Sequence, residues 1–253
     1  MSDIYVYGTI GQPGWWDDPE GYFDAKQMRD GLDEADGDDV TIHVNSGGGD
    51  VFEASTMASL VSQYRQRHPR AQVTTIIEGL GASAASYLGL TASRVLVAPS
   101  ARVMVHDPSG MCYGQAADMR KVADQLDLVR DTIAGIYARK SGRAQSDWLA
   151  AMAEETWYDA EEAVESGLAD AIDEEMPAIA ARIDPRIANT WRHAPESIRD
   201  MAGDEGESID EDEPEDEGEG SGDAPEPEAE AASRAVIVGG AVLVIKAKSS
   251  DKE

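Results

Sequence analysis

The amino-acid sequence predicts an α/β domain with largely parallel strand pairing. Two observations predict it. Short apolar runs rich in β-branched residues, such as 38–44 (DDVTIHV) and 72–77 (QVTTII), alternate with longer segments of helical spacing as far as about residue 172. Several of these runs also end in small or glycine-rich turns that open directly into a helical segment. A helical crossover between strands is the usual connection of a parallel pair.

Each element follows from a local pattern. Residues 4–9 (IYVYGT) and 38–44 read as strands, and Asp24 is placed to cap a short helix over 24–32. The apolar runs RVLVA and RVMVH predict two further strands joined by a PSA turn. The remaining helices are expected over residues 51–66, 83–90, 114–140, 146–152 and 160–166, and 175–201 has room for one more.

The composition divides the chain into four parts. Residues 1–174 form the α/β domain and residues 175–202 a possible helical extension. Between residues 203 and 230 there are 15 Asp and Glu and no Lys or Arg. The linker over 203–233 is therefore expected to be disordered, because its negative charges repel one another and it has almost no apolar side chains to bury. The last part, 234–253, holds the apolar run AVIVGGAVLVI, which is too short to span a membrane. It fits either a strand pair turning at Gly239–Gly240 or a contact segment for another protein.

The net charge of −29 narrows the range of partners. Without the 15 linker acids the charge is still −14, which opposes binding to nucleic acid or to an anionic membrane. A single cysteine, Cys112, excludes an internal disulfide and suits a reducing cytosol, and no signal peptide is expected. The four histidines are scattered, and the glycine run lacks the Lys–Ser/Thr ending of a phosphate loop, so neither a metal nor a cofactor is expected.

Three strand ends carry residues suited to nucleophilic chemistry. The stretch GASAAS places Ser83 on a tight turn between a strand and a helix, and VMVHDP leaves His106 just beyond a strand. The stretch NSGGGD offers consecutive backbone amides that could hold an oxyanion. Each signal alone has a simpler reading as helix packing, a buried histidine or a turn. Ser86, about one helical turn beyond Ser83, is expected to pack or to hydrogen-bond the preceding turn. The three signals together indicate a catalytic site.

The order HVNSGGGDVFEA, IEGLGASAASYLGLTAS, VMVHDPSG and ETWYDAEEAVESGLAD resembles the Clp protease proteolytic subunit (ClpP) family over roughly residues 3–173. It resembles most closely the ClpP-related head maturation proteases of tailed bacteriophages. The resemblance implies a spiral of ββα units, as in ClpP and crotonase-like proteins, and assembly into rings. It also implies that Ser83 is the nucleophile, that His106 is the base, and that the amides of Ala84 and Gly49 form the oxyanion hole.

The sequence departs from the family pattern at informative places. Gly47 stands where the housekeeping enzymes have proline, and the acid of the triad falls on Glu155. Little precedes the first strand where the family has loops that contact an ATPase, so the need for an unfoldase is open. Asp107 follows His106 directly and points to the other side of the strand. Asp159 with Glu162 has the spacing of a helix capping box. Glu155 is therefore the acid that we expect to orient His106.

These features predict a serine endopeptidase, either ATP-independent or assisted by a partner, that cleaves protein or peptide substrates. For a phage head maturation protease these would be capsid or scaffold proteins, processed in the bacterial host cytoplasm, with assembling proheads as a further location. The apolar spacing of residues 114–140 predicts self-association into a ring. Two alternatives remain open, a crotonase-like enzyme acting on acyl-CoA thioesters and a catalytically inactive shell or scaffold protein.

Overall fold

The computed structural model describes residues 2–14, 21–176, 183–201, 234–238 and 241–245. Its strands are β1 (Ser2–Ile10), β2 (Tyr22–Phe23), β3 (Val40–Gly49), β4 (Val73–Ala82), β5 (Arg94–Val97), β6 (Arg102–Val105), β7 (Gly110–Cys112), β8 (Thr156–Tyr158), β9 (Ala171–Ile172), β10 (Arg234–Val238) and β11 (Ala241–Ile245). Its helices are α1 (Ala25–Ala35), α2 (Val51–Arg67), α3 (Ala85–Leu88), α4 (Ala116–Ser141), α5 (Gln145–Ala153), α6 (Ala160–Ser166), α7 (Pro185–Ala188) and α8 (Glu196–Met201).

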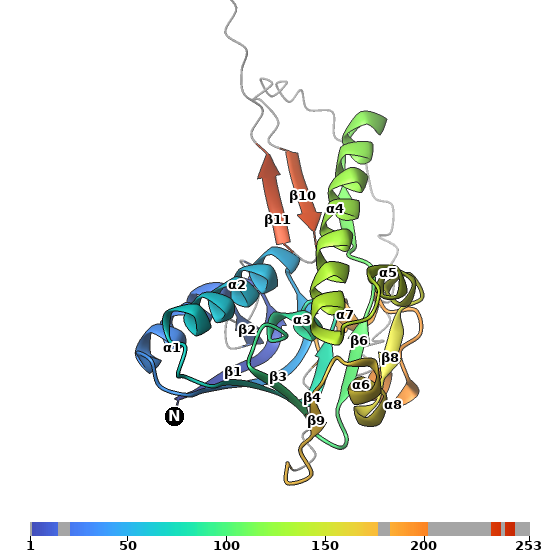
Figure 1. Cartoon of the computed structure of the whole chain (residues 1–253). Coiled ribbons are helices and arrows are strands. Elements are labelled where there is room, and N and C mark those ends of the chain that lie inside the picture. The colour runs from blue at the N-terminus through green and yellow to red at the C-terminus, as the bar shows by residue number, and fades with distance from the viewer. Residues whose placement is uncertain (1, 15–20, 177–182, 202–233, 239–240, 246–253) are drawn as a thin grey trace, which may run out of the picture.

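The main sheet has the order β2-β1-β3-β4-β5-β9, and β6 pairs with β4 and β8 (Figure 1). Within this sheet the strand pairs are parallel except for β6 with β8. The predicted α/β class with largely parallel pairing is therefore confirmed.

Strand β4 changes its neighbour along its length, and this change places the functional site. Its first half, Thr74–Ile77, pairs with β5, whereas its last residues, Leu80–Ala82, pair with β6. Because β4 and β6 run parallel, their carboxyl ends lie side by side. The residues that follow Ala82 and Val105 are thereby brought together.

The core forms where helices cover the sheet. Helices α1 and α2 lie side by side along β1 and β3 in Figure 1. Apolar side chains from strands and helices are fully buried between them, among them Val6, Ile42, Val44, Met57 and Val61. Each buried side chain of this size stabilises the fold by about 1.5–3 kcal/mol relative to exposure. The cap predicted for Asp24 is confirmed, with a capping box that Gln27 completes.

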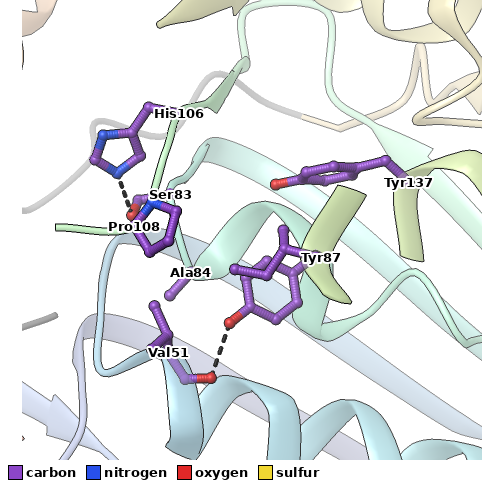
Figure 2. Close-up of a pocket in the computed structure, with 8 residues that line it drawn as sticks. Val51, Ser83, Ala84, Tyr87, His106, Pro108 and Tyr137 are labelled. Carbon is purple, nitrogen blue, oxygen red and sulfur yellow. Dashed lines mark hydrogen bonds between the residues drawn. The ribbon is translucent and has the colours of Figure 1, made fainter. Parts of the chain in front are cut away.

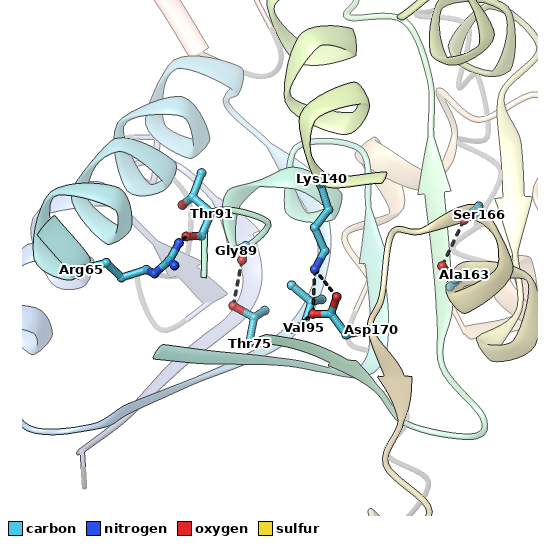
Figure 3. A network of polar contacts seen from close by, with 9 residues as sticks. All are labelled: Arg65, Thr75, Gly89, Thr91, Val95, Lys140, Ala163, Ser166 and Asp170. Atoms are coloured by element: carbon cyan, nitrogen blue, oxygen red, sulfur yellow. Dashed lines mark hydrogen bonds and ion pairs between the residues drawn. The ribbon is translucent and has the colours of Figure 1, made fainter. Parts of the chain in front are cut away.

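Helix α4 extends well beyond the body of the domain (Figure 1). Its carboxyl-terminal end is anchored, because Lys140 lies 2.6 Å from both carboxylate oxygens of Asp170, and Asp170 accepts the backbone N–H of Val95 at 2.7 Å (Figure 3). Towards its amino-terminal half the helix exposes Met119 and Leu128, at 51% and 69%. The anchored end packs in the core, and the other half leaves apolar surface uncovered.

Two predicted elements differ from the structure. The helix expected over residues 83–90 is only the short α3, which ends at Leu88. It cannot include Ser83, whose left-handed backbone conformation no α-helix continues through. The extension holds two short helices, α7 and α8, in place of one. Among the described residues, no helix is both long enough and apolar enough to span a bilayer.

The apolar carboxyl-terminal run forms a strand pair. Strands β10 and β11 pair antiparallel, and β10 also pairs with β7. This confirms the strand-pair alternative, although the turn at Gly239–Gly240 and the acidic linker 203–233 lie outside the described residues.

Candidate active site

Ser83 lies on the turn between β4 and α3 in a strained conformation. Its φ is 53°, in the left-handed region that residues with a Cβ seldom adopt. Its N–H donates to the carbonyl of Met104 at 2.9 Å, and its own carbonyl accepts the N–H of Ser86 at 3.0 Å. Strain of this kind costs on the order of 1–3 kcal/mol and is found at sites where a side chain must be presented at a tight turn.

Ser86 and Tyr137 support this turn through hydrogen bonds. The Ser86 hydroxyl donates to the Ser83 carbonyl, and it lies 2.5 Å from the hydroxyl of Tyr137 on α4. Because the Ser86 hydroxyl has one hydrogen, Tyr137 is the donor of the second bond. The expectation that Ser86 bonds the preceding turn is confirmed. The link to Tyr137 could not be read from the sequence, since 51 residues separate the two side chains.

His106 reaches Ser83 from the end of β6. Its Nε2 lies 2.7 Å from the Ser83 Oγ (Figure 2). The contact follows from the parallel pairing of Ala82 with Met104, which places the two residues beyond adjacent strand ends. Burial lowers the pKa of His106, the Glu155 charge opposes this effect, and the Arg192 charge adds to it. The imidazole is therefore neutral at neutral pH and can accept a proton.

The glycine loop packs directly against the Ser83 turn. A Cβ on Gly48 would lie 2.8 Å from both the Ala82 carbonyl oxygen and the Ser83 Cβ, and 3.0 Å from the Ala84 nitrogen. A Cβ on Gly49 would first meet Ile10 on β1, at 2.1 Å from its carbonyl oxygen. Gly48 is thus a site residue that the sequence reasoning missed, and the GGG run was its only signal.

Of the three candidate acids, Glu155 is the one whose charge acts on His106. Its side chain is buried, with 7% exposed, and its φ is 51°. Burial tends to raise the pKa of Glu155, but hydrogen bonds from the amides of Arg192 and His193, a bond from Trp157 and the His106 charge together lower it. Glu155 is therefore ionised. Within the described residues its influence on His106 is through charge, without a direct hydrogen bond.

The other two acids have different surroundings. Asp159 accepts the N–H of Glu162 at 2.9 Å, and the Glu162 carboxylate accepts the N–H of Asp159 at 2.9 Å, so the predicted capping box of α6 is confirmed. Asp107 donates its N–H to the Met152 carbonyl at 3.1 Å, and its Oδ1 is buried with no partner among the described residues.

A small pocket adjoins the Ser83 and His106 side chains (Figure 2). Its free volume of about 10 Å³ is room for roughly one water molecule. The residues around it come from α2, the Ser83 turn, the segment after β6 and α4: Val51, Ser83, Ala84, Tyr87, His106, Pro108, Ile133 and Tyr137. A substrate side chain could enter here only after a local shift of these walls.

The chain is similar to known proteins over this region. The family model described as Clp protease matches residues 30–176. This chain belongs to the Clp protease family. A similar relative is the ATP-dependent Clp protease proteolytic subunit 1 of Protochlamydia amoebophila (strain UWE25), which is 38% identical over 104 residues. The match covers 40% of this chain and 50% of the relative, so the chain spans about half the length of this Clp protease subunit. The family-matched segment includes Ser83, His106 and Glu155 and ends before the extension at 183–201.

Proposed function

We propose that this chain is a serine endopeptidase in which Ser83 is the nucleophile and His106 the general base. The observation that carries the proposal is the 2.7 Å contact between Ser83 Oγ and His106 Nε2 at the end of two parallel strands. The Ser83 proton passes to Nε2 as Oγ attacks the substrate carbonyl carbon. The imidazolium then gives this proton to the leaving amine as the peptide C–N bond breaks. In the second half His106 takes a proton from water, the hydroxide attacks the acyl carbon, and the proton returns to Ser83 Oγ as the acyl–Oγ bond breaks.

The oxyanion is held by the amides of Ala84 and Gly49. Ala84 directly follows the nucleophile, and its nitrogen faces the glycine loop. Asp50 donates its N–H to Ile10 on β1 at 2.8 Å. Gly49 belongs to the same glycine loop, whose Gly48 packs against the Ser83 turn and the Ala84 nitrogen. Loss of one such donor costs about 10²–10³-fold in turnover.

Glu155 completes the site as its acid. Its negative charge raises the pKa of His106 against the effect of burial, and this favours the imidazolium that forms during attack. Asp159 is occupied as a helix cap and has no comparable role. The site therefore operates as Ser83, His106 and Glu155.

Self-association into a ring would enclose this site. Helix α4 supports the proposal, because Val122 and Ile133 are buried within the chain while Met119 and Leu128 remain exposed on the same helix. Exposed apolar side chains along one projecting helix suit contact with another copy. Light scattering should give a mass of several chains, and a stable monomer at micromolar concentration would contradict the ring.

The substrates that we propose are capsid or scaffold proteins of a phage head, cleaved without an obligatory ATPase. The support is the resemblance to head maturation proteases and the protein substrates that the family as a whole implies. Co-expression with the candidate capsid or scaffold protein, with and without the Ser83→Ala substitution, should give cleavage only with the unaltered chain. Persistence of intact substrate in both would leave a peptidase with another substrate.

A fluorophosphonate probe tests the central proposal. It should label the full-length chain, and labelling should be lost in Ser83→Ala while the melting temperature is nearly unchanged. Hydrolysis of acyl-CoA thioesters without labelling would point to a crotonase-like enzyme. Neither labelling nor hydrolysis would indicate a shell or scaffold protein that retains the fold alone.

A further inference from the structure

The extension over residues 183–201 packs against the strands that carry the site. Its buried side chains Ile183, Trp191, Ala194 and Ile198 form a second apolar cluster with Leu80 and Ala82 of β4 and Met104 of β6. Ser83 immediately follows Ala82, and His106 comes two residues after Met104. The extension is therefore packed against both strand ends, although it lies outside the family-matched segment 30–176.

Trp191 lies against the glycine loop. A Cβ on Gly47 would lie 3.5 Å from two ring carbons of Trp191 and 3.7 Å from Ile183. The Trp191 ring also meets Trp157 of β8 edge-on, with 5.3 Å between ring centroids and 79° between planes. Such pairs contribute about 0.5–1.5 kcal/mol beyond their buried area. Trp191 therefore links the loop at Gly47 to the strand that follows Glu155.

The two residues after Trp191 bind the Glu155 carboxylate with their backbone. The N–H of Arg192 donates to Oε2 at 2.6 Å, and the N–H of His193 donates to Oε1 at 2.7 Å. The Trp157 indole adds a bond to Oε1 at 3.2 Å. Both oxygens are thus held by donors, and two of the three donors belong to the extension. Hydrogen bonds of this kind fix the orientation of a carboxylate and favour its charged form.

We propose that residues 191–193 of this extension are a positioning element of the active site, which holds the Glu155 carboxylate oriented and ionised. The proposal rests on the proposed function of Ser83 and His106. Trp191 is the positioning residue whose packing sets the place of the Arg192 and His193 amides. Both backbone donors bind the Glu155 carboxylate, so the element acts through Glu155.

The test compares Trp191→Ala with Ile198→Ala in the full-length chain. Both substitutions remove a buried apolar side chain from the same cluster, but only Trp191 adjoins the two donor amides. Trp191→Ala should lower kcat up to about a hundredfold, as a displaced catalytic group does, with little change in KM. It should also move the acid limb of the kcat profile to lower pH, since a displaced or neutral Glu155 no longer raises the pKa of His106. Ile198→Ala should lower stability and leave the pH profile in place, and Trp191→Phe should restore most of kcat.

A double-mutant cycle adds a readout of coupling. If Trp191 acts through Glu155, Trp191→Ala should lower kcat far less in a Glu155→Gln background than in the unaltered chain. Equal effects in both backgrounds, or a Trp191→Ala profile that matches the unaltered chain, would overturn the inference. A failure of the proposed function would give a different result from a failure of this inference. In the first case the unaltered chain itself would not react with the fluorophosphonate probe.

Discussion

Replacing Gly48 by alanine tests the contact between the glycine loop and the Ser83 turn. Gly48 has a φ of +99°, and a left-handed conformation costs about 1–2 kcal/mol for a residue with a Cβ. The new methyl would also lie 2.8 Å from the Ala82 carbonyl oxygen and 3.0 Å from the Ala84 nitrogen. Both are backbone atoms that cannot rotate away, and overpacking of this kind costs about 1–3 kcal/mol.

The expected loss in the free energy of unfolding is therefore about 2–5 kcal/mol, or about 4–20 °C in melting temperature for a chain of this size. Turnover should fall by about a hundredfold, because the Ser83 and Ala84 backbone must shift to admit the methyl group. Urea unfolding and hydrolysis of a fluorogenic peptide measure the two effects. A folded Gly48→Ala chain with unaltered turnover would refute this reasoning.

Gly142 provides the matched control. It is also left-handed, with φ +74°, but a Cβ there would meet nothing within 4 Å. Gly142→Ala should lower the free energy of unfolding only by the cost of the left-handed backbone, about 1–2 kcal/mol, and should leave turnover unchanged. The difference between the two variants measures the clash at the site alone.

Four further outcomes are expected. Ser83→Ala should reduce peptide hydrolysis by several orders of magnitude with the fold intact, as assayed by turnover and circular dichroism, and residual turnover above about one part in a thousand would point to another nucleophile. Glu155→Gln should lower the acylation rate severely. Asp159→Asn should leave that rate nearly unchanged and lower the free energy of unfolding by at most about 1 kcal/mol, because Asn also caps well. The reverse pattern would make Asp159 the acid. Because burial lowers the pKa of His106, the neutral base persists to lower pH than for an exposed histidine, and kcat/KM should be lost only as pH falls through this lowered value. Arg192→Gln removes a positive charge that also lowers the pKa of His106, so the acid limb should move to higher pH; an unmoved limb would show that this charge does not reach the imidazole.

The pairing of Ser83 with His106 could be predicted because both follow strands. Parallel strands bring their carboxyl ends to one edge of a sheet, so residues at two such ends are candidates for contact before any coordinates exist. The cap at Asp159 was predictable for a different reason, since its partner Glu162 is three residues away and the spacing is visible in the chain. The surroundings of Glu155 were not predictable, because its two donor amides lie 37 and 38 residues further along.

The sequence by itself determined the features that depend on neighbours within a few residues: the periodicity of strands and helices, the caps and the small residues of the Ser83 turn. Only the tertiary structure decided that β4 changes partner from β5 to β6, that Gly48 adjoins Ser83 and that the 183–201 extension reaches Glu155. The physical reason is that such contacts depend on how whole elements pack. Packing depends on the buried area and the shape of many side chains across the whole chain, so it cannot be predicted from a short stretch of residues.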